Sequence, residues 1–213
     1  MSDGGSTIAF AVSESGSIQV SGSVSLSVRT SLVWQWAQIA VKHEAEAHDV
    51  RGRGEIDNNE LQASMVCIAA TAFALDAIYA EQREVVPEKD RQKWLDNRTA
   101  RWRQIYETLR RAFRLCRGLR AEMQWLFERD ELGRDFLVHP DAEFREPADH
   151  PLLPNTTAER SRLRAENATR AVDLLMEVLE TAITSKTPAS QEWTRQNTGV
   201  TEEVRALQER LRG

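Results

Sequence analysis

The sequence predicts an all-α protein: an up-and-down bundle of about five helices, with a β-hairpin arm before it and a short helix behind it. Apolar residues between positions 30 and 186 recur every three or four residues, the period of a helix with one buried face. Prolines and glycines fall between these stretches, where they end helices. Within residues 1–29 the apolar period is two instead, as in a strand.

The N-terminal segment, residues 1–29, is predicted to form a β-hairpin arm. It is rich in Ser and Gly, yet its larger apolar residues all occupy even positions, at Ile8, Phe10, Val12, Ile18, Val20, Val24, Leu26 and Val28. Ser15-Gly16 suits the turn. A lone hairpin is marginal in water, so we expect its apolar face to lie against helices or another chain. A Ser-rich tail without strands is the alternative.

The first two helices are predicted at about residues 30–49 and 58–85. The first carries His43 and His48, which are five positions apart instead of the four that a zinc-binding helix requires, so we expect no metal site here. The second is apolar nearly all round, which predicts the central helix. Its inner charge, Asp76, should have a partner. We expect a structural ion pair; the alternative is that Asp76 orients a catalytic histidine.

A charged loop, residues 87–97, is predicted to lead into a third helix at about residues 97–117. Between Arg98 and Arg120 there are eight arginines and one acid, although the whole chain carries a net charge of −5. One stripe of this helix is apolar, and a second stripe consists of Arg103, Arg110, Arg114 and Arg117. Such a stripe is usually a solvated face. Here we expect it to contact RNA phosphates.

A fourth helical run begins near Ala121 and is expected to end in the stretch from Gly133 to Pro140. Pro140 disfavours the helical conformation at His139, so the helix should stop there, with Arg134 and His139 on its last turn and a half. A guanidinium fits a phosphate, and an imidazole exchanges protons near neutral pH. This pair suits a transesterification at an RNA phosphate. The alternative is that His139 only caps the helix.

The same stretch resembles the R-x4-6-H signature of the HEPN superfamily, small all-helical proteins of which many are metal-independent RNases in toxin or antiviral-defence systems. Arg134 and His139 match the two defining positions, and Asp135 matches the polar position after the arginine. The resemblance covers residues 30–186. It implies an endoribonuclease without cofactor, whose catalytic residues are Arg134, Asp135 and His139.

One chain supplies only one arginine and one histidine to such a site, so the resemblance also implies a homodimer. Its further partners would be RNA and a cognate antitoxin or a subunit of a defence complex. The alternative is a catalytically inactive HEPN-like dimer that serves as a scaffold.

Residues 140–154 contain four prolines and are expected to wrap the surface near the motif. Thr156 and Glu159 offer a capping box for a fifth helix that extends to about Thr184. Asn167, a polar residue in its apolar pattern, is a candidate hydrogen-bond partner for the motif side chains. Residues 187–213 are predicted to be an appendage outside the core.

Composition excludes several classes of protein. An acidic chain of 213 residues is no generic nucleic-acid coat. The most apolar run, Gln62–Leu75, has 14 residues and is too short to span a bilayer. The N-terminus lacks the basic start and apolar block of a signal peptide, so we expect a cytoplasmic protein without membrane contact. Cys67 and Cys116 are expected to be reduced core residues.

Overall fold

The computed structural model describes residues 32–54, 58–128, 148–150, 153–156, 161–197 and 199–212. The chain divides into two units, Met1–Thr30 and Ser31–Gly213, and the described residues all belong to the second. The predicted hairpin arm therefore lies outside the described residues. The described part contains eight α-helices and one short antiparallel strand pair, β1 (Ala148–His150) and β2 (Leu153–Thr156). The all-α class is confirmed, but five helices were too few.

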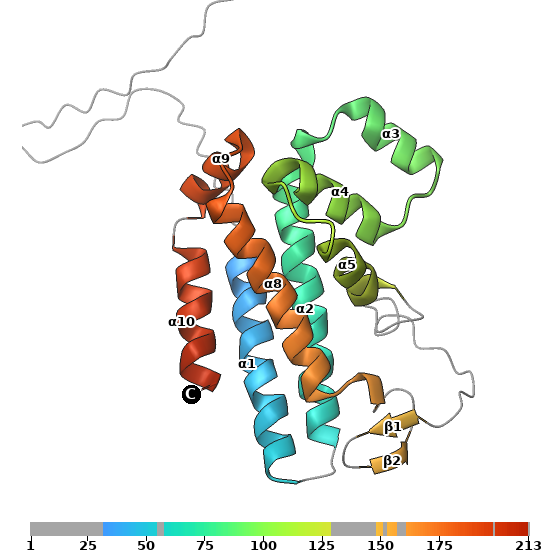
Figure 1. The fold of residues 1–213 in the computed structure, drawn as a ribbon, viewed down its shortest axis with the longest axis vertical. Coiled ribbons are helices and arrows are strands. Elements are labelled where there is room, and N and C mark those ends of the chain that lie inside the picture. Colours follow the sequence, from blue (N-terminus) through green and yellow to red (C-terminus); the bar gives the residue numbers. More distant parts are fainter. Residues whose placement is uncertain are drawn as a thin grey trace, which may run out of the picture. The chain divides into compact units, whose positions relative to one another are not determined.

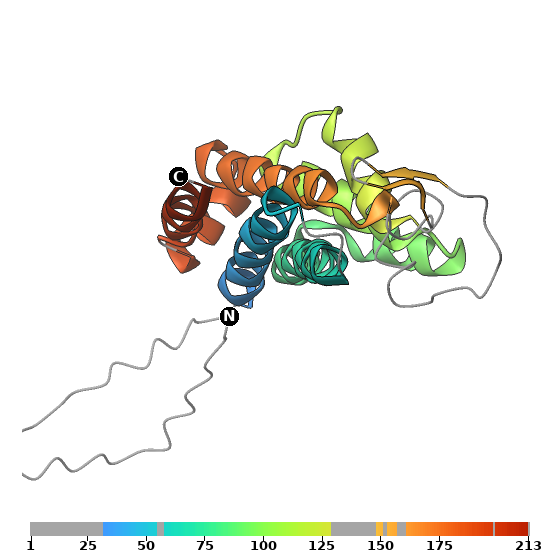
Figure 2. The same cartoon turned by 90° about the horizontal axis from the view of Figure 1, so that it is seen from below.

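Three long helices form the centre of the bundle: α1 (Val33–Gly52), α2 (Asn58–Gln82) and α8 (Ala165–Thr184). A further helix, α10 (Val200–Arg212), lies along α1 on the side away from α2 (Figures 1 and 2). The bundle is not a simple up-and-down one. α2 and α8 run parallel, because the chain makes a long excursion between them through α3, α4 and α5.

The central helices approach closely because alanine fills their contacts. Small side chains leave room for two backbones to come together, and the buried methyl groups still remove apolar surface from water. The buried alanines of these helices are Ala37, Ala40, Ala47, Ala63, Ala70, Ala72, Ala74, Ala165, Ala168, Ala171 and Ala182. The expectation that no stretch is long enough to span a bilayer was wrong: by length and composition α2 could cross one, but most of its apolar segment is buried inside the bundle. Its predicted central position is confirmed.

A buried carboxylate sets the start of α8. Glu60, in the first turn of α2, accepts a hydrogen bond of 3.0 Å from the backbone N–H of Ala165. This satisfies one of the amide groups left open at a helix N-terminus, and its negative charge suits that end of the helix dipole. The predicted capping box was wrong as the start of this helix. Thr156 belongs to β2, and α8 begins nine residues later.

The excursion begins with a single 3-10 turn, Arg83–Val85, followed by α3 (Glu88–Asp96). The expectation of a charged loop at this place was wrong. Glu, Lys, Gln and Arg are good helix formers, and the acids at Glu88 and Asp90 suit the positive end of the helix dipole. α3 buries none of its residues.

Two further helices complete the excursion: α4 (Arg101–Phe113) and α5 (Leu119–Phe127). α4 is shorter than predicted, since Arg114 adopts a left-handed backbone (φ 62°) and ends it. α5 is held to α8 by a bidentate pair, in which the Arg170 guanidinium donates to both carboxylate oxygens of Glu122 at 2.7 and 2.9 Å. The same guanidinium lies over the Trp125 ring, 4.0 Å from its centroid.

α5 ends at Phe127, because the next residue, Glu128, has an extended backbone (ψ 139°). Its side chain accepts hydrogen bonds from Trp102 Nε1 and Gln124 Nε2, both at 2.7 Å. The expectation of one continuous helix from Ala121 to the Arg-x4-His motif is therefore wrong. The chain leaves the helix six residues before Arg134.

The C-terminal residues are part of the core, which corrects the expectation of an appendage. Thr187 caps α9 (Pro188–Gln196): its hydroxyl accepts from the N–H of Ser190 at 3.0 Å and donates to the carbonyl of Ala112. Trp193 is fully buried against Phe113, with ring centroids 5.8 Å apart, and its Nε1 donates to Glu81 at 2.9 Å. In α10, Thr201 and Val204 are buried as well. The bundle therefore continues to the end of the described chain.

Candidate nucleic-acid interface

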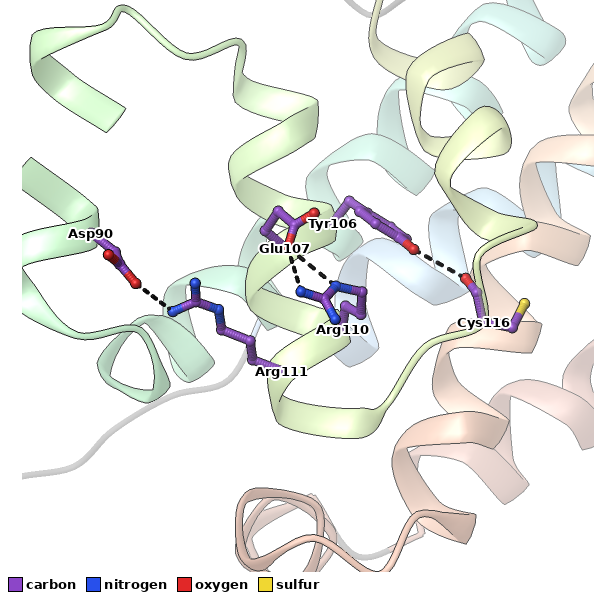
Figure 3. A network of polar contacts seen from close by, with 6 residues as sticks. All are labelled: Asp90, Tyr106, Glu107, Arg110, Arg111 and Cys116. Atoms are coloured by element: carbon purple, nitrogen blue, oxygen red, sulfur yellow. Dashed lines mark hydrogen bonds and ion pairs between the residues drawn. The ribbon is translucent and has the colours of Figure 1, made fainter. Parts of the chain in front are cut away.

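The segment of residues 98–120, which contains α4, carries eight arginines, and all of them are exposed. All four members of the predicted stripe are exposed: Arg103, Arg110, Arg114 and Arg117. These arginines do not all present free charge, however. Figure 3 shows Arg110 folded back onto Glu107, to which its guanidinium donates two hydrogen bonds of 3.1 and 2.8 Å. Glu107 also raises the pKa of Arg110. The positive charge of Arg110 is thus largely offset by the carboxylate of Glu107.

Arg111, next to it, reaches α3 and donates to Asp90 at 2.9 Å (Figure 3). This hydrogen bond holds the pKa of Asp90 below its ordinary value. The remaining members of the stripe, Arg103, Arg114 and Arg117, have no ion pair with any carboxylate of the described residues. They are the cations of this face that stay open to an anionic ligand.

A groove of about 750 Å³ lies between α3 and α4. Its floor and walls come from α3, from the connection to α4, from the exposed face of α4, and from the end of α5 at Glu128. The lining residues are Asp90, Lys93, Trp94, Asn97, Arg98, Thr99, Ala100, Trp102, Arg103, Glu107, Arg111 and Glu128. One open member of the arginine stripe, Arg103, therefore faces this groove.

Two of the three acids of the groove are paired with arginines, whereas three of its cations have no carboxylate partner among the described residues. Asp90 is paired with Arg111, Glu107 with Arg110, and Glu128 accepts from Trp102 and Gln124. Among the described residues, no carboxylate pairs with the remaining lining cations, which are Lys93, Arg98 and Arg103. The groove thus offers net positive charge to a ligand.

Arg98 reaches the groove from a strained backbone position. It has a φ of 48°, and it ends α3 in a Schellman arrangement: its N–H bonds to the carbonyl of Leu95 at 3.1 Å, and the N–H of Thr99 bonds to that of Trp94 at 2.8 Å. Glycine is the usual residue here, because a side chain costs about 1–2 kcal/mol in the left-handed region. An arginine at this position places its charge at the groove.

Asp76 and Asn167, which were considered as partners of the motif side chains, each bind another residue. Arg101 donates from both Nε and a terminal nitrogen to Asp76, at 2.9 and 2.7 Å, which confirms the expected structural ion pair. The guanidinium also stacks on Tyr79, 4.2 Å from the ring centroid. Asn167 Nδ2 donates to the carbonyl of Arg162 at 2.7 Å, so it supports the approach to α8. Arg134, Asp135 and His139 lie outside the described residues.

Three groove residues were missed at the level of sequence: Lys93, Trp94 and Arg98. Their signal was present, since basic residues interleaved with an aromatic one are typical of nucleic-acid binding. Lys93 and Trp94 were not recognised because residues 87–97 were expected to form a loop, and Arg98 was counted only as one of the eight arginines of residues 98–120. The expectation for Cys116 was also wrong: Cys67 is buried, but Cys116 is exposed.

The described residues contain no cluster of three or more potential metal ligands. The two histidines of α1 are used otherwise, because His43 pairs with Glu46 at 2.8 Å and His48 lies 2.6 Å from the Thr169 hydroxyl. Comparison with family profiles, curated proteins and solved structures found no significant match to this chain.

Proposed function

We propose that this protein is a metal-independent endoribonuclease of HEPN type, with an active site assembled from Arg134 and His139 of two subunits, and that it acts as a toxin or antiviral-defence effector. The observation that carries the proposal is the Arg-x4-His sequence that follows the cationic groove along the chain. Arg134 comes six residues after Glu128, which lines the groove. An extended chain of six residues reaches at most about 20 Å.

The electrostatics of the described bundle support an RNA substrate. The net charge of −5 disfavours unspecific binding over the whole surface. The open cations on α4 and at the groove, by contrast, supply a local attraction for phosphates, which is the main term in the affinity for nucleic acids. An acidic protein with one cationic face would hold RNA at that face alone.

In the proposed reaction, His139 takes the proton from a ribose 2′-hydroxyl or gives one to the leaving 5′-oxygen. The 2′-oxygen attacks the adjacent phosphorus, the bond from phosphorus to the 5′-oxygen breaks, and a cyclic phosphate remains. Arg134 binds the non-bridging oxygens as their negative charge grows. Asp135 positions its two neighbours. Two copies of the motif would divide the acid and base roles, which is the reason to expect a homodimer.

The decisive experiment is cleavage of an end-labelled RNA pool in the presence of EDTA, with the wild type beside His139→Ala. We expect the wild type to cleave, since the chemistry uses only a guanidinium and an imidazole. His139→Ala should lose about 10²- to 10⁴-fold in rate, the usual contribution of general acid–base catalysis. Arg134→Lys should also be impaired, because an ammonium cannot replace a bidentate fork.

Mapping of the product ends provides the second readout, since transesterification leaves a cyclic phosphate on one fragment and a 5′-hydroxyl on the other. Equal cleavage by wild type and His139→Ala would refute the assignment. The remaining function would then be that of a HEPN-like scaffold or regulatory subunit.

A further inference from the structure

We propose that the groove between α3 and α4 is a nucleotide-binding site, in which the Trp94 ring stacks on an unpaired base and Arg98 and Arg103 hold the adjoining phosphate. The inference deepens the proposed function and rests on it, because an RNA chain would supply the nucleotide. A free nucleotide has the same chemistry, and the experiment below separates the two sources.

Trp94 is the tryptophan of the groove that is available for stacking, since the other one, Trp102, lies beneath Arg120. The Trp94 side chain is half-buried and lines the groove. Other tryptophans of the described residues have partners: Trp36 lies against Phe73, Trp193 against Phe113, and Trp102 and Trp125 lie beneath arginines. No ring or guanidinium of the described residues stacks on Trp94. A base could therefore stack on the ring of Trp94 without displacing a protein group.

The charges around the ring suit a phosphate. Arg98 and Arg103 both line the groove without a carboxylate partner among the described residues, and Lys93 adds a third open cation. An arginine binds phosphate through two parallel hydrogen bonds, which is a stronger and more directional contact than a single charge makes. Ring and cations together match the two halves of a nucleotide, the base and the phosphate.

The strained position of Arg98 supports this assignment. A residue in left-handed conformation costs about 1–2 kcal/mol unless it is glycine, and such positions cluster at functional sites. Arg98 has a φ of 48° and is exposed to solvent, so core packing does not account for its side chain. A phosphate contact in the groove does.

The site would select unpaired bases. A base inside a duplex already stacks on neighbours through both faces, and it is unavailable to a protein ring. Stacking on a tryptophan is open to any single-stranded base and tolerates many sequences. We therefore expect a preference for single strands over duplexes, with little preference among bases.

The test measures binding by the full-length His139→Ala chain, so that the RNA stays intact. The probe is a fluorescently labelled 12-nucleotide oligouridine, either alone or annealed to oligoadenosine, followed by fluorescence anisotropy. In this background, Trp94→Ala should weaken single-strand binding by about 5- to 100-fold, the usual effect of losing one base stack. Duplex affinity should change little, and Trp94→Phe should restore much of the loss.

Leu95→Ala is the matched control, because Leu95 is the next residue of α3, is 64% exposed and lies outside the groove lining. If Trp94→Ala and Leu95→Ala bind the single strand equally well, the inference is wrong. A crosslink makes the test independent of variant folding. A 12-mer that contains 5-iodouridine should crosslink to Trp94, and crosslinks found only outside residues 93–103 would overturn the site.

A second pair of variants tests the cations. Arg98→Ala with Arg103→Ala removes two charges from the groove, whereas Arg114→Ala with Arg117→Ala removes two open charges outside it. The groove pair should flatten the salt dependence of single-strand binding, by about 0.7 in the log–log slope for each phosphate that the protein no longer neutralises. It should also reduce the preference for single strands, which the control pair should leave unchanged. Identical effects of the two pairs would overturn the assignment.

Uridine 5′-monophosphate identifies the source of the nucleotide. If it competes with the 12-mer at similar concentration, the groove binds a free nucleotide; if the 12-mer binds far more tightly, the ligand is RNA. The inference and the proposed function can fail separately. Binding that depends on Trp94, with cleavage that does not depend on His139, keeps the site and removes the RNase. The reverse result keeps the RNase and removes the site.

Discussion

Two arginines of the described residues, Arg98 and Arg114, occupy the left-handed region of the backbone, with φ values of 48° and 62°. They end α3 and α4, where a positive charge is favourable for the helix dipole. That benefit is about 0.3–1 kcal/mol, whereas the backbone conformation costs about 1–2 kcal/mol. The favourable interaction of the charge with the helix dipole is therefore smaller than the backbone strain. We infer that these arginine side chains have a further role.

Replacement of each arginine by glycine separates strain from binding. We expect Arg98→Gly and Arg114→Gly each to raise the free energy of unfolding, by up to about 1 kcal/mol, because glycine adopts this conformation freely. Urea denaturation measures the change. Arg98→Gly should weaken single-strand RNA binding more than Arg114→Gly does, since Arg98 lines the groove and Arg114 does not. A loss of stability in both variants would show that side-chain contacts outweigh the strain.

The Asp90–Arg111 pair predicts a defined pH dependence at the junction of α3 and α4. The pKa of Asp90 is lowered in the folded state, chiefly by the hydrogen bond from Arg111. Its contribution to stability is therefore complete above the unfolded-state pKa, and is lost as the pH falls through the lower folded-state value. We expect Arg111→Ala to raise the pKa of Asp90 toward its ordinary value.

Titration of the side-chain carboxyl carbons by NMR checks this expectation. Arg110→Ala serves as the control, because Arg110 binds Glu107 and not Asp90. An Asp90 pKa that stays low after removal of Arg111 would contradict the ion pair.

At the scale of elements, α3 and α9 have nine residues each but are held in different ways. α3 buries no residue, and is attached through ion pairs of Asp90 with Arg111 and of Arg91 with Glu84. Exposed ion pairs contribute at most about 1 kcal/mol each. α9 buries Trp193 in the core. We infer that α3 is the helix more easily displaced, which suits the wall of a ligand groove.

One tryptophan in each of these helices allows a matched comparison. Trp193→Ala should lower the free energy of unfolding by about 3–5 kcal/mol, because it removes a fully buried ring and deprives Glu81 of the indole N–H. Trp94→Ala should cost less, since Trp94 is only half-buried. Chemical denaturation of both variants measures the difference. Similar losses would mean that α3 is as firmly packed as α9.

At the scale of the whole molecule, the first and the last helix of the unit Ser31–Gly213 pack against each other, since α10 lies along α1. Residues 187–213 therefore belong to the folding unit. The role of the N-terminal arm stays a prediction. Its alternating apolar residues need a partner surface, either on this bundle or on a second chain.

Deletion of residues 1–29 tests this expectation. The truncated chain should have a lower melting temperature, if the arm covers the bundle, or a changed mass in solution, if the arm pairs with another subunit. Calorimetry and light scattering at micromolar concentration give the two readings, and the full chain should have the mass of a dimer. A truncated chain with unchanged melting temperature and mass would indicate a tail without strands.

The sequence by itself determined the features that depend on near neighbours in the chain. The apolar period and the flanking breakers predicted one helix at about residues 58–85, where the structure has α2, which begins at Asn58, followed by the 3-10 turn that ends at Val85. They also identified α2 as the central helix and the arginine stripe as exposed, although only Arg103 and Arg110 of that stripe lie on α4. These features are local, because a helix needs only its own periodicity and its own end signals.

Only the tertiary structure decided where α5 ends, that residues 187–212 belong to the core, and which side chains surround the groove. Each depends on residues far apart in the chain: Trp102 binds Glu128, Trp193 binds Glu81, and Glu60 caps Ala165. The same holds for charge. The sequence counts Arg103 and Arg110 alike, but the fold leaves one open at the groove and pairs the other with Glu107. Such pairings arise when the helices pack, and no local pattern encodes them.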